Sequence, residues 1–116
     1  MPFSLFKKKN NHKPDYSEID SNEKAALLYI NKVVAKMHLM PLEFGGKDSP
    51  VNTLYAPVEA VELKTRFDAM IEELLEQGKE LSYSAEPGYK GKSFIPNTIT
   101  IRVSGDADFI ETIHIW

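Results

Sequence analysis

Cysteine is absent from this chain of 116 residues, basic residues do not outnumber acidic ones, and no long apolar run occurs. The lack of cysteine excludes a disulfide framework, a thiolate zinc site, a cysteine-held iron–sulfur cluster and a cysteine nucleophile. Because 14 Lys+Arg face 17 Asp+Glu, the formal charge is −3, which argues against binding to nucleic acid through the overall field. A bilayer-spanning helix needs about 20 apolar residues. We therefore expect a cytoplasmic protein with no membrane span and no nucleic-acid partner.

The length and composition predict a single domain, since domain count scales as roughly one per 150 residues. Hydrophobic residues make up 42% of the chain and charged residues 27%, close to the averages of soluble globular proteins. Residues 1–19 contain the run Lys7-Lys8-Lys9 beside paired asparagines and a proline. We interpret residues 1–19 as a flexible basic tail and residues 20–116 as one α+β domain.

A first helix is predicted over residues 23–37. The run Asp20-Ser21-Asn22-Glu23 has the form of a capping box, in which Asp20 accepts a backbone N–H and Glu23 reaches back. The apolar residues that follow recur at the spacing of one helical face; they are Leu27, Ile30, Val34 and Met37. A linker rich in glycine and proline is expected over residues 41–56.

A second helix is predicted from Pro57 to Gly78. Proline suits the first helical position, where its missing N–H is no loss, and glycine is a common C-terminal cap. The apolar stripe of this helix consists of Leu63, Phe67, Met70, Ile71 and Leu74. Its opposite face is rich in glutamate, which is typical of a solvated helix face.

Three strands are expected after this helix, because apolar and polar residues alternate in the segments 81–86, 98–103 and 109–116. Residues 104–108 are typical of a turn, so the last two strands should form an antiparallel hairpin. The order α-α-β-β-β predicts a two-layer sandwich, with two N-terminal helices packed on one face of a three-stranded antiparallel sheet. Glu111 breaks the alternation, because strict alternation from Phe109 would point it toward the core. Either a bulge or a later start of the strand would correct the register.

The other face of this sheet is expected to be open to solvent. Alternation places mostly polar side chains there, together with the C-terminal tryptophan. The residues of this predicted open face are Thr98, Thr100, Arg102, Ile110, Thr112, His114 and Trp116.

The segments that resemble motifs for catalysis or metal binding lack the neighbouring residues that those motifs require. Gly91-Lys92-Ser93 matches only the end of a P-loop, since Glu86 stands where the first glycine belongs and a strand follows instead of a helix. Asp106 and Asp108 suit a tight turn, and no EF-hand pattern continues after them. The histidines show no metal-ligand spacing; they are His12, His38 and His114. We therefore expect no metal, no cofactor and no catalytic residue.

A nucleophilic relay is one interpretation of His114, because Ser82 or Ser84 would approach it if their strands were neighbours. No nucleophile elbow and no oxyanion-hole glycine pattern accompany these residues. We favour the simpler interpretation of His114 as an exposed histidine on a strand.

The preferred functional hypothesis is a small non-enzymatic interaction protein that binds and masks a basic protein, as bacterial toxin immunity proteins and antitoxins do. Complementary charge speeds such association, and aromatic residues are common interface anchors. The predicted partner-binding residues are Glu72, Glu73, Glu76, Arg102, Thr112, His114 and Trp116. The candidates on loops are Phe44, Asp48, Tyr55, Tyr89, Lys90 and Lys92.

Two alternatives stay open. A small ligand-binding or enzymatic domain would use a pocket between the sheet and the loop 41–56, with Tyr55, Tyr83 or His114. A homodimeric subunit of a larger assembly would associate through the edge of the C-terminal strand or through the open sheet face.

Overall fold

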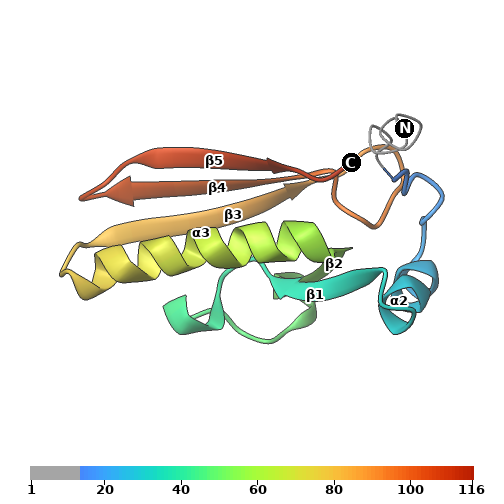
Figure 1. Ribbon diagram of the computed structural model, residues 1–116, viewed down its shortest axis with the longest axis horizontal. Coiled ribbons are helices and arrows are strands. Elements are labelled where there is room, and N and C mark those ends of the chain that lie inside the picture. The colour runs from blue at the N-terminus through green and yellow to red at the C-terminus, as the bar shows by residue number, and fades with distance from the viewer. Residues whose placement is uncertain (1–13) are drawn as a thin grey trace, which may run out of the picture.

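The computed structural model describes residues 14–116 as an α+β protein with two helices and two antiparallel sheets (Figure 1). Strands β1 and β2 form a hairpin, and β3, β4 and β5 form a three-stranded sheet in that order. The elements are α2 (Asn22–Ile30), β1 (Val34–His38), the 3₁₀ turns η1 (Leu42–Phe44) and η2 (Pro50–Asn52), β2 (Thr53–Pro57), α3 (Val58–Glu76), β3 (Leu81–Gly88), β4 (Thr98–Gly105) and β5 (Phe109–His114). Over this part of the chain, no helix is both long enough and apolar enough to cross a membrane.

Helix α2 is shorter than predicted and begins with a different cap. The N-cap is Ser21, whose side chain accepts the backbone N–H of Lys24, while Asp20 pairs with the Lys24 ammonium at 2.8 Å. The helix ends at Ile30, because Lys32 has φ 63° and turns the chain into the left-handed region. The backbone N–H of Val33 then donates to the Leu28 carbonyl, as in a Schellman motif.

The predicted helix over 23–37 is therefore wrong in its second half, where residues 34–38 form strand β1. This strand pairs with β2, so part of the predicted linker 41–56 is also a strand. Val34 lies opposite Pro57, and Met37 lies opposite Leu54. The two helices are separated by two strands, and the predicted order α-α-β-β-β does not hold.

The Asn52 side chain holds together the long connection of the hairpin. Its Oδ1 accepts the Met40 backbone N–H at 2.8 Å, and its Nδ2 donates to the carbonyls of Met40 and Lys47, both at 2.9 Å. These bonds fix η1 against the start of β2. Phe44 and Glu43, which η1 carries, thereby acquire a defined position beside α3.

The three-stranded sheet agrees with the prediction in its strands, pairing and turn. The register of β4 against β5 runs from Thr98 opposite His114 to Val103 opposite Phe109. It contains no bulge within these residues, so Glu111 keeps its place opposite Ile101, where the edge position of β5 leaves it exposed. On the other face the predicted residues of β4 and β5 are exposed or half-buried, which confirms their outward direction.

The main core joins the hairpin, α3 and the sheet. Figure 1 shows α3 running along the length of the sheet, with β1 and β2 beside its N-terminal half. The buried members of this core are Met37, Leu54, Ala56, Ala60, Ile71, Ile99, Ile101, Val103, Ile113 and Ile115. Ile71 and Ile99 are 1% and 0% exposed, so α3 and β4 both contribute fully buried side chains to this core.

A second, smaller core lies beside α2 and contains Tyr16, Ala25, Val34 and Ile95. The backbone N–H of Phe94 donates to the Ile19 carbonyl at 2.7 Å, which ties the segment before α2 to the loop before β4. The packed body therefore begins before residue 20, the predicted end of the tail. The basic run at residues 7–9 lies outside the described residues.

Candidate functional site

Lysine 64 occupies an inward position on α3. The helix turns its buried side toward the core at Ala60, Lys64 and Ile71, which follow one another at helical spacing. Lys64 is 3% exposed, and Phe67 beside it is half-buried. Because a buried ammonium is costly unless it is paired, this position conflicts with the apolar stripe around it and marks a candidate functional site.

Asp68 and Tyr83 complete a polar group around Lys64. The Lys64 ammonium lies 2.7 Å from Asp68 Oδ2, and the Tyr83 hydroxyl donates to Asp68 Oδ1 at 2.6 Å. The ammonium also lies over the Tyr83 ring, 5.6 Å from its centroid, and the ring meets Phe44 edge to face at 5.3 Å. Burial, the hydrogen bond to Asp68 and the charge of Asp68 all raise the pKa of Tyr83 above its usual value near 10.

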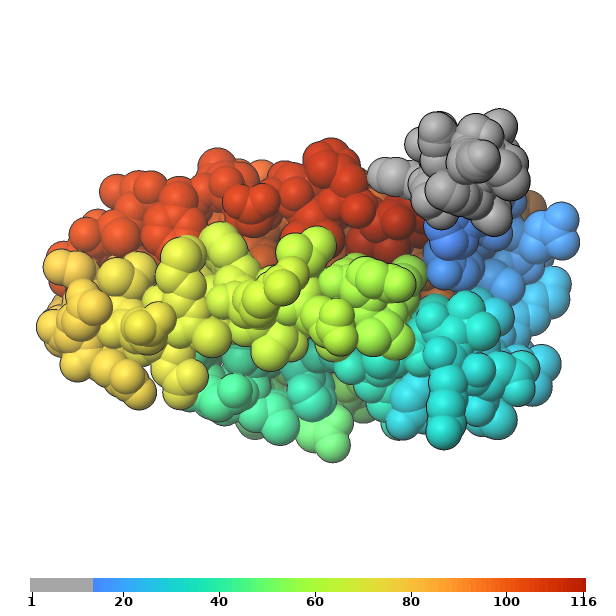
Figure 2. Space-filling model, viewed as in Figure 1, coloured from blue at the N-terminus to red at the C-terminus, as the bar shows by residue number. Residues whose placement is uncertain are grey.

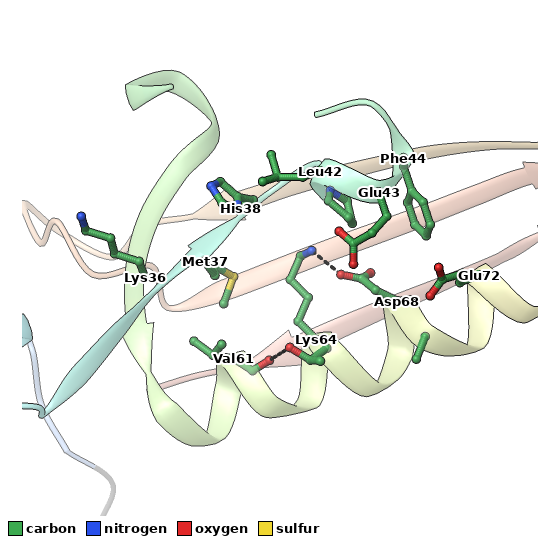
Figure 3. A pocket seen from close by; sticks show the side chains of 13 residues that line it. Lys36, Met37, His38, Leu42, Glu43, Phe44, Val61, Lys64, Asp68 and Glu72 are labelled. Atoms are coloured by element: carbon green, nitrogen blue, oxygen red, sulfur yellow. Dashed lines mark hydrogen bonds and ion pairs between the residues drawn. The ribbon is translucent and has the colours of Figure 1, made fainter. Parts of the chain in front are cut away.

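A cavity of about 370 Å³ lies above this group, between α3 and the segment 36–44 (Figure 3). Its apolar lining comes from Met37, Pro41, Leu42, Phe44, Val61 and Ala69. Its polar lining comes from Lys36, His38, Glu43, Lys64, Thr65, Asp68 and Glu72. In Figure 3 the Lys64 side chain rises from α3 toward this space, with the Asp68 carboxylate next to its ammonium.

The carboxylates of Glu43 and Glu72 stand at the exposed rim of the cavity, one on η1 and the other on α3. His38 also lines the cavity, and its Nε2 lies 3.1 Å from Asp48 Oδ1. The floor is thus an internally paired group, whereas the two rim glutamates form no ion pair within residues 14–116.

The raised pKa of Tyr83 predicts a loss of stability in alkali. Above pH 10 the unfolded chain releases the phenolic proton and the folded chain keeps it, so the free energy of unfolding should fall by about 1.4 kcal/mol per pH unit from this group. In Tyr83→Phe that contribution disappears. Urea unfolding of both proteins at pH 9 and pH 11 measures the difference, and equal slopes against pH would refute the assignment.

An acidic ridge, defined as Glu72, Glu73 and Glu76, continues from this rim along the C-terminal half of α3. All three side chains are exposed, and this half of the helix is the yellow segment on the face in Figure 2. Four of the 14 basic residues precede residue 14, whereas all 17 acidic residues follow it, so the described body has a formal charge of −7. The ridge concentrates part of that charge.

The candidates on the sheet do not gather into one site. Arg102, Thr112 and His114 lie on the open face, where Arg102 is opposite Ile110 and His114 is opposite Thr98. Trp116 departs from the prediction. It is half-buried, its Nε1 donates to the Ile95 carbonyl at 3.1 Å, and its ring meets Tyr16 edge to face at 5.9 Å.

The loop candidates divide among three places. Phe44 lines the Lys64 cavity, whereas Asp48, Tyr55 and Tyr89 line a second, open depression that also contains Phe94. Tyr55 packs on Tyr29 with ring centroids 5.3 Å apart. Lys90 lies over the Trp116 ring at 5.2 Å, and Lys92 is exposed.

The structure excludes the relay between Ser82 or Ser84 and His114. Strand β4 separates β3 from β5, and His114 lies in register with Thr98 and Gly88 instead of either serine. The turn interpretation of Asp106 agrees with its contact, because its Oδ2 accepts the Glu80 backbone N–H at 2.8 Å. Across residues 14–116, no three His, Asp or Glu side chains are placed to hold a metal ion.

Sequence reasoning missed Lys64, Asp68 and Glu43. Two signals point to the first pair: Lys64 and Asp68 are four residues apart, and Lys64 lies three residues before Phe67 and seven before Ile71, on the phase of the buried stripe. Tyr83 was expected only in the alternative of a ligand pocket. Neither protein-family models, curated proteins nor solved structures give a match to this chain.

Proposed function

We propose that the protein is a non-enzymatic interaction module that binds a basic protein through the acidic ridge of α3. The observation that carries this proposal is the exposure of Glu72, Glu73 and Glu76 together on one helix, in a chain whose formal charge is −3. Such a surface attracts a basic partner and raises the association rate. A toxin neutralised by an immunity protein or antitoxin is the partner class that we propose.

The position of the ridge on its helix supports a role in binding. The C-terminal end of a helix carries partial negative charge, and a carboxylate there costs about 0.3–1 kcal/mol. Residues 73–76 read Glu-Leu-Leu-Glu, so the last turn of α3 places two carboxylates where lysine or arginine would stabilise the helix. A basic partner would interact favourably with these two carboxylates and so offset their destabilisation of the helix end.

Affinity capture with charge-matched variants tests the proposal. One variant carries Glu72→Gln, Glu73→Gln and Glu76→Gln; its control carries Glu18→Gln, Glu23→Gln and Glu86→Gln, which change the net charge equally at other exposed positions. We expect crosslinked capture from the source organism to retain one basic protein in stoichiometric amount. The ridge variant should bind it at least about tenfold more weakly, and the control should bind it nearly as the wild type does.

Two results would count against the proposal. One is equal loss in both variants, because it would show a general charge effect instead of a defined ridge. The other is recovery of an acidic or uncharged partner whose binding is insensitive to salt, since binding between exposed charges weakens with ionic strength.

A second function, binding of a small ligand, is favoured by a different observation. The cavity above Lys64 lies between α3 and the segment 36–44, and its floor is a buried ion pair with a tyrosine hydroxyl. Concave sites with apolar walls and a few convergent polar groups are typical of ligand pockets.

A further inference from the structure

The Lys64 cavity combines three kinds of surface that match one class of small molecule. A buried ammonium lies at its floor, two exposed carboxylates stand at its rim, and apolar side chains form its walls. We infer that the cavity binds a zwitterionic α-amino acid with an apolar side chain. This inference rests on the second function proposed above and is independent of the protein partner.

The floor of the cavity offers hydrogen-bond donors to an oxygen acceptor on the ligand. A lysine ammonium has three N–H bonds, and within residues 14–116 its one hydrogen bond goes to Asp68. Lys64 also lines the cavity, so a group that enters the cavity can reach the remaining donors. A ligand carboxylate entering the cavity would accept from these donors, and charge-assisted bonds of this kind are stronger than neutral ones.

The rim of the cavity carries negative charge, which would attract a cationic group on the ligand. Glu43 and Glu72 are exposed carboxylates on opposite walls of the cavity, from η1 and α3 respectively. With Asp68, three carboxylates line the cavity against the ammonium groups of Lys36 and Lys64. A plain anion would be repelled by this excess of carboxylates, and a plain cation would provide no acceptor for the donors of Lys64 that Asp68 leaves free. A zwitterion would place its carboxylate against the ammonium at the floor and its ammonium against the carboxylates at the rim.

The walls select an apolar body of modest size. Met37, Leu42, Phe44 and Val61 supply aliphatic and aromatic surface around the polar floor. The volume of about 370 Å³ is at the lower end of the range for ligand cavities. The cavity is therefore large enough to admit an aliphatic amino acid such as leucine, and its lining matches such a molecule in polarity.

Titration of the purified chain with three matched probes tests the inference. The probes are L-leucine, 4-methylpentanoate, which lacks the amine, and 3-methylbutylamine, which lacks the carboxylate. Binding is followed by amide chemical shifts in ¹⁵N-labelled protein up to about 10 mM ligand. We expect leucine to shift residues around Glu43, Lys64 and Glu72, with each half-molecule binding at least tenfold more weakly.

Variants at the exposed rim separate the two ends of the ligand without disturbing the buried floor. Glu43→Gln with Glu72→Gln should weaken leucine about tenfold and leave 4-methylpentanoate unchanged or tighter. The pair Glu73→Gln with Glu76→Gln, which makes the same charge change outside the cavity, should leave leucine binding unchanged. The inference is overturned if leucine produces no shifts, or if either half-molecule binds as tightly as leucine. Because only the purified chain is used, failure here is distinct from failure to capture a basic protein.

Discussion

Asp68→Ala is expected to lower the free energy of unfolding by about 3–5 kcal/mol, because removal of one partner of a buried ion pair leaves an uncompensated charge in the interior. The Lys64 ammonium is 2.7 Å from this carboxylate and is almost inaccessible to solvent. The same substitution removes the acceptor of the Tyr83 hydroxyl. Chemical denaturation at pH 7 measures the loss.

An all-apolar variant provides the matched comparison for this ion pair. When Lys64→Met, Asp68→Leu and Tyr83→Phe are combined, no charged or polar group is left without its partner. Apolar replacement of a complete buried pair is often neutral or stabilising, so this variant should unfold within about 1–2 kcal/mol of the wild type. If Asp68→Ala lowered the free energy of unfolding by less than about 1 kcal/mol, the ion pair would be solvated, and the description of Lys64 and Asp68 as a buried pair would be refuted.

Gly105→Ala is expected to destabilise the protein by about 3–5 kcal/mol, combining backbone strain with steric overlap. Gly105 ends β4 at φ 118°, a conformation that side chains other than glycine rarely adopt. A Cβ atom at this position would also overlap the backbone carbonyl of Glu80, which cannot move without breaking the start of β3.

Gly78 is the control for this prediction. It follows α3 with φ 90°, and a Cβ atom there would meet nothing within 4 Å. Gly78→Ala should therefore cost only the strain of positive φ, about 1–2 kcal/mol. Equal losses at Gly78 and Gly105 in thermal or chemical denaturation would show that the contact with Glu80 has no energetic role.

The sheet and the second helix were predictable because their signals are local and repeated. Alternation defines the strands of the three-stranded sheet, and the turn residues 104–108 fix the hairpin between the last two. The inward face of α3 was predicted only in part. Phe67 and Ile71 point inward, whereas Leu63 and Met70 are 47% and 43% exposed.

The first helix was predicted to be too long because the buried residues of a strand with two buried faces can have the same spacing as one face of a helix. Val34 and Met37 are three residues apart, as on one face of a helix, but on β1 they point to opposite faces. Val34 enters the smaller core and Met37 enters the main core. The helix instead ends at Ile30, because Lys32 just beyond it adopts a positive φ without being a glycine, and composition alone does not reveal this.

The cavity was hidden from sequence reasoning for a different reason. Charged residues on an amphipathic helix are ordinarily assigned to solvent, and Lys64 was not singled out from them. Its partners come from distant segments: Tyr83 from β3 and Glu43 from η1. Only the folding of the hairpin and the sheet against α3 brings these side chains together.

Hydrogen exchange on the complex with the captured basic protein tests the central claim most directly. If the acidic ridge is the binding surface, partner binding should slow exchange in the C-terminal half of α3, around residues 72–76, and leave the open sheet face unchanged. The contrary result is protection of residues 100–103 and 110–114, around Arg102 and His114, with α3 unaffected. That result would assign recognition to the sheet and contradict the ridge.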